Sequence, residues 1–439
     1  MKNIAEILSK IKTISTDSRT AGQGDLFIAI IGEKFDGHDF VADVIARGAE
    51  FAIVSRPIDG VSADKQIIVP DTKKAFLEIG EFIRHKSPEL KVIALTGSAG
   101  KTTTKEMLKH VLSKFANVYA THANFNNDIG IAKTLCEIPS GTEIAIIEIG
   151  MSHAGEIANI VPHVRPDVAI VTNVYPMHLE NFADISGIAN AKAEIFSGLK
   201  QGGIAVINTD TDCADILISA APSNVVLYGK KDLINVSELE NQTNVIANID
   251  NKKIEFTLPM IGNHNVYNAL CILSTVNALG FDIEIAATAL ADFGALPGRG
   301  KVHNLTLKNG GKWTLIDESY SAQPESLKLA IKNFDKMQAK HKIAVIGKMA
   351  EIGDQSEQMH REIGKLLAKT NINVVVGVCP ETKDILGQLP ASIKQFYFES
   401  ADGLENFLSD ELLDDGDVVL IKGSHYGSKL FQIVEKLLK

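Results

Sequence analysis

A short run of small residues carries the strongest chemical signal in this sequence. It follows an apolar stretch at 92–95 and reads Gly97-Ser98-Ala99-Gly100-Lys101-Thr102-Thr103-Thr104. The pattern predicts a buried strand, a tight turn and a helix that begins at Lys101, because apolar residues then recur on one helical face (Met107, Leu108, Val111, Leu112 and Phe115). Such a turn brings backbone N–H groups and the positive end of the helix dipole to one point, where phosphate oxygens can bind. Lys101 would add charge at the β- and γ-phosphates, and the Thr102 hydroxyl would reach a bound Mg²⁺.

The loop departs at one position from the general phosphate-binding pattern, which opens with a glycine where this chain has Leu95. A bare Gly-Lys-Thr occurs often by chance, and a helix start with a surface lysine would also explain it. The strand, turn and helix around the motif favour phosphate binding. The segment therefore predicts a nucleoside triphosphate as ligand, without defining the reaction.

Three residues downstream are candidates for the same site. Glu148 ends the apolar run 144–148, and an acid at the carboxyl end of a parallel strand beside the phosphate loop lies where magnesium needs a ligand. A solvated acid at a strand end is an equally good interpretation. His178 follows the run 168–171 and would lie at the same edge, although a lone histidine is more often structural. Lys192 lies on a predicted helix, where spacing alone favours an exposed lysine.

Weaker signals come from polar residues that stand in otherwise apolar surroundings. They could recognise a base, a ribose or a peptide, or they could only cap turns. They are Asn124, Asn126 and Asn127, then Asn263, His264, Asn265 and Asn268, and finally Arg299.

The elements that must position these residues form three α/β domains. A length of 439 residues suggests two or three cores. Residues 1–88 hold short apolar runs and an amphipathic helix at 72–85, and Ser87-Pro88 forms a boundary because the residue before proline avoids helical backbone. Strand, turn and helix then alternate through 89–298, with β-branched runs typical of buried parallel strands. The alternation resumes in 299–439, after a linker at 294–300.

Composition excludes several classes of protein. The net charge of −10 argues against nucleic-acid binding, because no basic excess exists to replace counterions, although a nucleotide can still bind locally. The four cysteines form no C-x-x-C pair, which favours reduced buried thiols over disulfides or zinc. Residues 1–13 lack an apolar core, and no window approaches the roughly 18 apolar residues of a membrane span. A cytoplasmic protein that is not inserted into a membrane is predicted.

Taken together, these segments resemble the Mur ligase family over nearly the whole chain. The phosphate loop with its continuation to Met107 is similar to the ATP loop of that family, so the missing first glycine is a family trait. Further matching segments are 16–19 (Thr-Asp-Ser-Arg), 24–27 (Gly-Asp-Leu-Phe), 32–38, 126–130 (Asn-Asn-Asp-Ile-Gly) and 148–157 (Glu-Ile-Gly-Met-Ser-His-Ala-Gly-Glu-Ile).

The resemblance implies a function for each domain. Residues 1–88 would bind a UDP-sugar, 89–298 would form a phosphate-loop ATPase domain with a parallel sheet, and 299–439 would form a Rossmann-like domain that binds a dipeptide and part of ATP. The implied reaction is ATP-dependent: D-Ala-D-Ala is added to UDP-N-acetylmuramoyl-tripeptide through an acyl phosphate, in the cytoplasmic stage of peptidoglycan synthesis. Two Mg²⁺ ions and a monomeric enzyme are also implied.

The resemblance also assigns roles to the candidate residues. The loop residues Gly97, Ser98, Ala99, Gly100, Lys101, Thr102 and Thr103 would bind ATP, together with Asn265 and Asn268 at the adenine, Arg299 at the phosphates and Asp317 at the ribose. Thr102, Glu148 and His178 would bind magnesium, and Lys192 matches a lysine that carries a CO₂-derived carbamate as a metal ligand. Ser18, Arg19, Asn126, Asn127 and Tyr320 would contact the substrates.

The third domain departs from the family pattern. The family has D-D-S-Y-N-A-N-P where this chain has Asp-Glu-Ser-Tyr-Ser-Ala-Gln-Pro at 317–324, so Glu318 replaces the second Asp, and Ser321 and Gln323 replace the two Asn residues. Lys348 stands where Asp is usual, and His425 stands where Arg is usual. The contacts of these residues with the incoming dipeptide are therefore left open.

Two other interpretations compete with this one. The first is a related ligase, either folylpolyglutamate synthase or the ligase that adds the third residue; the segment 16–27 and Ser98-Ala99 favour the dipeptide-adding activity. The second is a switch that hydrolyses a nucleotide to change partners, which the lack of an N-K-x-D segment and the third α/β unit disfavour. The sequence does not define the third residue of the tripeptide.

Overall fold

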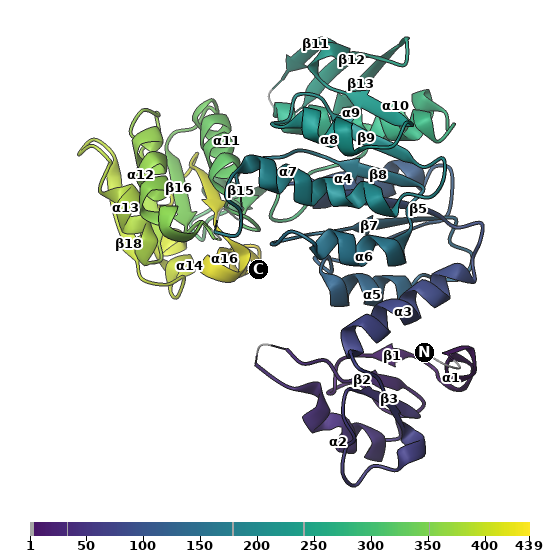
Figure 1. Cartoon of the computed structure of the whole chain (residues 1–439). Coiled ribbons are helices and arrows are strands. Elements are labelled where there is room, and N and C mark those ends of the chain that lie inside the picture. Colours follow the sequence, from purple (N-terminus) through teal and green to yellow (C-terminus); the bar gives the residue numbers. More distant parts are fainter. Residues whose placement is uncertain (1–3, 33, 178–179, 240–241, 351) are drawn as a thin grey trace.

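The computed structural model describes residues 4–32, 34–177, 180–239, 242–350 and 352–439. Its chain forms three units, with the N-terminal unit below the central one and the C-terminal unit beside it (Figure 1). The predicted α/β architecture with parallel sheets is confirmed.

The N-terminal unit is built on a parallel sheet of four short strands in the order β1-β2-β3-β4. Side chains of a strand alternate between the two faces of a sheet. Phe27 and Val54 therefore face Val41 on α2, whereas Leu26 and Ile53 face the opposite core. The elements are α1 (Ile4–Lys10), β1 (Ile14–Ser15), β2 (Leu26–Ile28), η1 (Gly37–Phe40), α2 (Val41–Ala46), β3 (Phe51–Val54), η2 (Ala63–Lys65) and β4 (Gln66–Ile68).

Helix α3 (Thr72–His85) has the bounds that its apolar periodicity predicts. It begins after Asp71, whose carboxylate accepts hydrogen bonds from two backbone N–H groups of the first turn. Its apolar face, with Phe76 and Ile79, packs into one core with residues of α5 (Asp128–Cys136) such as Leu135. The helix therefore joins the N-terminal sheet to the central unit.

The central sheet has six parallel strands in the order β10-β9-β8-β5-β7-β6. Strand β5 lies between β7 and β8, so the carboxyl ends of these three strands meet at one edge of the sheet. Their residues are almost entirely buried, as expected for strands covered on both faces. The strands are β5 (Lys91–Thr96), β6 (Val118–Ala120), β7 (Ile144–Glu148), β8 (Val168–Val171), β9 (Ile204–Asn208) and β10 (Val225–Tyr228).

Helices cover both faces of this sheet (Figure 1). On one face Ala94 packs with α5, α6 and α7, and on the other Ile93 packs with α4, α9 and α10. The helices are α4 (Lys101–Leu112), α6 (Glu156–Val164), α7 (Ile185–Ala193), η3 (Glu194–Gly198), α8 (Ala214–Ala220), η4 (Lys230–Asp232), α9 (Asn263–Ala278) and α10 (Ile283–Leu290).

The sequence analysis missed an antiparallel sheet that lies over α9 and α10. It consists of β11 (Leu233–Glu238), β12 (Thr243–Ile249) and β13 (Lys252–Leu258). Burial alternates along β12, and Asp250 and Asn251 turn the chain with φ of 51° and 63°. Period-two alternation around an Asp-Asn turn is a hairpin signal, so the sequence did contain the information.

The C-terminal unit has a six-stranded sheet in the order β14-β15-β19-β16-β17-β18. Strand β14 is antiparallel to β15, and the other pairs are parallel. The strands are β14 (Lys301–Thr306), β15 (Lys312–Glu318), β16 (Lys342–Gly347), β17 (Val374–Val378), β18 (Lys394–Phe398) and β19 (Val418–Lys422). The helices are α11 (Pro324–Asp335), η5 (Gly353–Gln355), α12 (Ser356–Leu367), η6 (Pro380–Thr382), α13 (Lys383–Leu386), α14 (Leu404–Asn406), η7 (Phe407–Leu412), α15 (His425–Ser428) and α16 (Leu430–Leu437).

Two predictions from composition can be compared with this fold. Within the described ranges, no helix combines the length and apolar character needed to cross a membrane. The four cysteines are free, as predicted, but only Cys271 and Cys379 are buried. Cys136 and Cys213 are partly exposed, so the prediction of buried thiols is wrong for these two.

Candidate functional site

A large cleft lies where the carboxyl ends of β5, β7 and β8 face the C-terminal unit. Its volume is about 1740 Å³, and residues 98–103 of the phosphate loop line it together with Glu148. Arg299 and Lys348 from the C-terminal unit line the same cleft. Parallel α/β sheets place ligands at this edge, so the predicted phosphate loop opens into the expected place.

Two glycines give the phosphate loop its shape. Gly97 has φ of 155°, and a Cβ atom there would lie 1.9 Å from the Thr172 hydroxyl oxygen. Gly100 has φ of 77°, and its Cβ would lie 3.0 Å from Asn268 Oδ1. Glycine at 97 is therefore required by space as well as by backbone conformation.

The segment that follows β8 holds the loop in place. The Ala99 N–H donates to Asn173 Oδ1 (2.7 Å), and the Thr172 hydroxyl donates to the Ala99 carbonyl oxygen (2.9 Å). The Ser98 N–H donates to the Asn173 carbonyl oxygen (3.0 Å). The sequence analysis did not single out Thr172 or Asn173, although two polar residues directly after a buried strand were a signal for them.

Helix α4 begins at Lys101, as predicted. The first N–H groups of a helix have no acceptor inside it, and the residues that carry them here, 100–103, line the cleft. The Lys101 ammonium donates to the Gly97 carbonyl oxygen (2.7 Å), which keeps its charge at the loop. A phosphate group would meet amide hydrogens, the helix dipole and an ammonium together.

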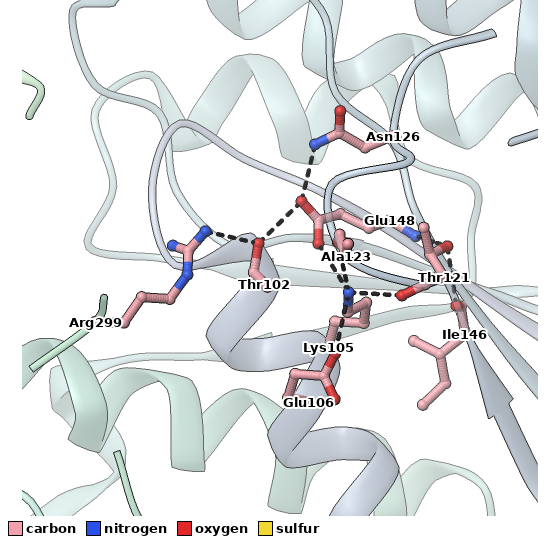
Figure 2. A network of polar contacts seen from close by, with 9 residues as sticks. All are labelled: Thr102, Lys105, Glu106, Thr121, Ala123, Asn126, Ile146, Glu148 and Arg299. Atoms are coloured by element: carbon pink, nitrogen blue, oxygen red, sulfur yellow. Dashed lines mark hydrogen bonds and ion pairs between the residues drawn. The ribbon is translucent and has the colours of Figure 1, made fainter. Parts of the chain in front are cut away.

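Glu148 lies at the centre of a polar network beside the loop (Figure 2). Its Oε1 atom accepts hydrogen bonds from the Thr102 hydroxyl (3.2 Å) and from Asn126 Nδ2 (3.0 Å). Its Oε2 atom accepts no hydrogen bond from the described part of the chain and lies 3.6 Å from Lys105 Nζ. The residue is only 1% exposed, so the interpretation as a solvated acid at a strand end is wrong.

Arg299 connects the C-terminal unit to this network. Its Nη2 atom donates to the Thr102 hydroxyl oxygen (3.0 Å), and its guanidinium group lies 4.3 Å from the centre of the Tyr320 ring. The family resemblance implies that Arg299 contacts the phosphates, and in the structure it lies within hydrogen-bond distance of Thr102 in the phosphate loop.

Lys192 is buried on α7, with 1% of its surface exposed. The interpretation as a surface lysine is therefore wrong. Burial, and then the charge of Lys101, lower the pKa of the Lys192 amine well below its usual value. Lys192 does not line the cleft, and His178, the other predicted partner of a second metal ion, lies outside the described residues.

The residues predicted to contact the adenine and the ribose of ATP lie in different places. Asn265 and Asn268 lie in the first turns of α9 and line the cleft. The Asp317 carboxylate instead accepts hydrogen bonds from the Gly298 N–H (2.6 Å) and the Ser319 hydroxyl (2.6 Å), and it is not part of the cleft lining. Its position shapes the linker between the units.

The predicted substrate contacts are divided between two regions. Asn126, Asn127 and Tyr320 line the cleft, and Asn127 also caps α5 through a hydrogen bond from the Gly130 N–H (2.9 Å). Ser18 and Arg19 lie in the N-terminal unit and do not line it.

Arg19 is largely exposed and forms an ion pair with Asp17 (2.7 Å). Its hydrogen bonds lower the pKa of the Asp17 carboxyl to about 2.

The C-terminal rim of the cleft carries the residues that depart from the family pattern. Lys422 donates to Glu318 Oε2 (3.0 Å) and to the Ser321 carbonyl oxygen (2.9 Å), and Lys348 donates to Glu381 Oε1 (3.1 Å). The sequence analysis missed Lys422 as a member of this rim.

An aromatic stack lies at the same rim. The His425 ring stacks on Phe431 (4.0 Å between centres) and lies near Tyr320 (5.0 Å). Burial lowers the pKa of His425.

The network around Glu148 is suitable for one magnesium ion. Mg²⁺ prefers oxygen ligands and usually takes one or two from the protein, with phosphates and waters supplying the others. Thr102 and Glu148 offer a hydroxyl and a buried carboxylate beside the phosphate loop. Among the described residues, no group of three His, Cys, Asp or Glu forms a complete metal site.

Comparison with known proteins assigns this arrangement to a family. The sequence pattern of the Mur ligase family catalytic domain matches residues 10–91, that of the Mur ligase middle domain matches 95–276, and that of the Mur ligase glutamate ligase domain matches 304–425. The UDP-N-acetylmuramoyl-tripeptide–D-alanyl-D-alanine ligase of Rickettsia prowazekii is 35% identical, over 96% of this chain and 94% of the relative.

Solved structures show the same relationship. The crystal structure of MurF from Acinetobacter baumannii has a TM-score of 0.87 at 33% identity and covers 98% of this chain and 93% of its own. MurF ligase from Thermotoga maritima in complex with ADP has a TM-score of 0.83 at 26% identity, over 100% of this chain and 98% of its own. With its phosphate loop, its three α/β units and a similarity that spans the whole sequence, this chain belongs to the Mur ligase family.

Proposed function

We propose that this chain joins D-Ala-D-Ala to the terminal carboxylate of UDP-N-acetylmuramoyl-tripeptide, with ATP as the source of energy, in the synthesis of peptidoglycan precursors. The names of its relatives support the two substrates, and the ADP complex of the Thermotoga maritima enzyme supports the nucleotide. The observation that carries the proposal is the phosphate loop, which opens with Glu148 and Arg299 into one cleft of about 1740 Å³. Pockets for a single small ligand are usually smaller, at about 300–1000 Å³, so this cleft has room for more than one substrate.

The chemistry explains why ATP is needed. A carboxylate is a poor electrophile, and an amine does not displace its oxygen directly. Attack of a carboxylate oxygen on the γ-phosphorus of ATP gives an acyl phosphate and releases ADP. The amine of the dipeptide then attacks the carbonyl carbon through a tetrahedral intermediate, and inorganic phosphate and a proton leave as the amide forms.

The loop residues compensate the negative charge that this reaction gathers. The amide hydrogens of 100–103 and the Lys101 ammonium would bind the phosphates, and Arg299 would approach them from the C-terminal unit. Phosphoryl transfer requires little covalent chemistry from the protein, so positioning and electrostatics provide most of the catalysis.

Magnesium is part of the proposal. Thr102 and Glu148 would hold one ion, which when bound neutralises phosphate charge and draws electrons from the γ-phosphorus. A second ion would be held by His178 and by Lys192 as its carbamate, formed when the amine nitrogen adds CO₂ and loses a proton. The support for Lys192 is the family resemblance together with its burial on α7.

The C-terminal rim would bind the dipeptide. Its carboxylate requires a cation, and Lys348 lines the cleft with about a third of its side chain exposed. A Cβ atom on Gly427 would lie 2.7 Å from Lys348 Cε and 2.3 Å from Ser424 Oγ, so these two side chains are neighbours. The Ser424 hydroxyl is buried and finds no hydrogen-bond partner within the described ranges. The Lys348 ammonium, which also donates to Glu381, and the Ser424 hydroxyl would thus bind one carboxylate together.

The remaining parts of the proposal concern the whole chain. Residues 1–88 would bind the UDP end of the acceptor through Ser18 and Arg19, 89–298 would bind ATP, and 299–439 would deliver the dipeptide. Asn126, Asn127 and Tyr320 would contact the peptide, Asn265 and Asn268 the adenine, and Asp317 the ribose. We further propose a cytoplasmic monomer, as the family resemblance implies.

An assay of ADP release tests this function. The purified protein should release ADP only when both UDP-N-acetylmuramoyl-tripeptide and D-Ala-D-Ala are present, and mass spectrometry should find the joined product. Lys101→Ala should reduce turnover by about 10²-fold or more, since it removes a charge that stabilises the transition state. Lys109→Ala, at an exposed position of the same helix, is the matched control and should keep wild-type turnover.

The assay also separates the competing functions. A nucleotide switch would release ADP without either acceptor. A ligase that adds the third residue, or a folylpolyglutamate synthase, would require a different acceptor and would ignore the dipeptide. Wild-type turnover by Lys101→Ala would remove the phosphate loop from the mechanism.

A further inference from the structure

Lys105, four residues beyond Lys101 on α4, is fully buried. A buried ammonium is costly unless acceptors and opposite charge surround it. Phosphate binding by the loop does not involve this residue. Its surroundings therefore require an explanation of their own.

The Lys105 ammonium has partners for all of its hydrogens (Figure 2). It donates to the carbonyl oxygens of Thr121 (2.7 Å) and Ala123 (3.1 Å). It also forms ion pairs with Glu106 Oε1 (3.1 Å) and Glu148 Oε2 (3.6 Å). An ammonium has three donors, so this set satisfies it.

Helix geometry connects Lys105 to the candidate magnesium ligands. Residues three apart in a helix lie on the same face, and Thr102 and Lys105 have this spacing. Thr102 contacts Oε1 of Glu148, and Lys105 contacts Oε2. One face of α4 thus engages both oxygens of the carboxylate.

Lys105 also holds the loop that contacts Glu148 from the other side. Ala123 has φ of 48°, a left-handed conformation that is strained for a residue with a Cβ atom. Its carbonyl group is nevertheless fixed by Lys105, and three residues later Asn126 donates to Glu148 Oε1 (3.0 Å). The Thr121 hydroxyl oxygen accepts a hydrogen bond from the backbone N–H of Glu148 (3.0 Å). The Lys105 ammonium therefore contacts both the loop at 121–126 and the Glu148 carboxylate.

We propose that Lys105 is a positioning residue for magnesium: it holds Glu148 Oε2 and the loop 121–126 so that Oε1 stays beside the Thr102 hydroxyl. The inference rests on the proposed magnesium–nucleotide site. If Lys105 only stabilised the packing of α4 against β6, it would not affect magnesium binding. The proposal gives this buried lysine that additional effect.

Binding of ADP, measured by calorimetry with magnesium and then with EDTA, tests the role. The ratio of the two affinities isolates the contribution of the metal from that of the loop amides. In Lys105→Met this ratio should fall about 10-fold or more, the usual effect of losing a residue that orients a metal ligand. The affinity in EDTA should stay within about threefold of the wild-type value, since the loop N–H groups remain.

Lys200→Met is the matched control. Lys200 donates to both carboxylate oxygens of Asp167 (2.8 and 2.7 Å) at the opposite edge of the same sheet, so its loss also breaks an ammonium–carboxylate pair. The variant should melt at a lower temperature and keep the wild-type affinity ratio. An unchanged ratio in Lys105→Met would show that Lys105 has only a structural role.

A second measurement applies even where Lys105→Met folds poorly. Loss of the ammonium leaves a buried carboxylate without its counter-charge, and Glu148→Gln removes that carboxylate. The double variant should therefore melt at a higher temperature than Lys105→Met alone, and an equal or lower value would contradict the pairing. If the wild-type protein itself bound ADP equally with magnesium and EDTA, the magnesium site of the proposed function would fail, and the role of Lys105 with it.

Discussion

At the level of single residues, the structure departs most from the sequence-based interpretation at two buried lysines. Lysine is among the residues least often found inside proteins, so spacing alone assigned Lys192 to the surface. The structure buries both Lys192 and Lys105 near the phosphate loop. A pattern that counts lysine as polar cannot find such residues. Lys105 could still have been suspected, because it falls on the apolar face of α4 with Leu108 and Leu112.

Lys192 gives a prediction at this scale. Lys192→Ala should retain about a tenth of wild-type turnover or less, because the proposed carbamate would be lost. Added bicarbonate should not restore activity, since alanine has no amine that could react. Lys192→Met, which keeps more of the buried volume, should behave in the same way if the nitrogen is what matters.

The turnover of both variants is measured as steady-state ADP release with and without bicarbonate, and circular dichroism checks their fold. A fully active Lys192→Ala enzyme would return this lysine to a structural role. Activity that is lost in Lys192→Ala and kept in Lys192→Met would assign the effect to packing.

Among the elements, the two glycines before helices α4 and α6 offer a matched comparison. Gly97→Ala would place a methyl group 1.9 Å from the Thr172 hydroxyl oxygen and displace the phosphate loop. Gly155, which precedes α6, has φ of 87° and open space where a Cβ would be. Gly97→Ala should therefore abolish measurable ADP binding. Gly155→Ala should lower stability by about 1 kcal/mol and leave ADP binding unchanged.

Calorimetric titration with ADP and thermal melts check this pair. Normal ADP binding by Gly97→Ala would mean that the loop tolerates a different path and that the contact with Thr172 does not shape it. Loss of binding in Gly155→Ala as well would indicate that general instability, rather than the loop, is measured.

The elements also show what the sequence can predict. Periodicity located α3 at 72–85 and the buried strands β5, β7 and β8 of the central sheet, because long amphipathic helices and β-branched runs have strong local signals. It did not reveal which strands are neighbours. The contacts of Thr172 and Asn173 with Ala99 join residues more than 70 positions apart, and no local pattern contains such information.

At the scale of the whole molecule, the cleft is a product of two units. The central sheet supplies the phosphate loop and Glu148, whereas Arg299 and Lys348 arrive from the C-terminal unit. Arg299 stands at the end of the linker at 294–300, and its hydrogen bond to Thr102 couples the two units. A reaction that joins two substrates and excludes water suits such a divided site, because relative motion of the units can close it.

Lys348 provides the prediction at this scale. The dipeptide carboxylate needs a cation. Both lysines of the C-terminal rim pair with a glutamate, Lys422 with Glu318 and Lys348 with Glu381, but Lys422 is only 3% exposed whereas the Lys348 side chain is 32% exposed. Lys348→Ala should therefore raise the KM for D-Ala-D-Ala about 10-fold, the equivalent of one hydrogen bond to a charged group, and leave the KM for ATP unchanged. Lys340→Ala is the control, because Lys340 pairs with Asp414 and does not line the cleft.

The same ion pair can be tested from the side of the dipeptide, by replacing its C-terminal carboxylate with an amide. If Lys348 binds the carboxylate, the wild-type enzyme should use the C-terminal amide of D-Ala-D-Ala poorly, and Lys348→Ala should barely distinguish the amide from the acid. The two losses should not add, since each removes one side of the same ion pair. Should the amide and the Lys348 substitution weaken turnover independently, the carboxylate would bind elsewhere on the rim, and Ser424 or Lys422 would be the residues to change next.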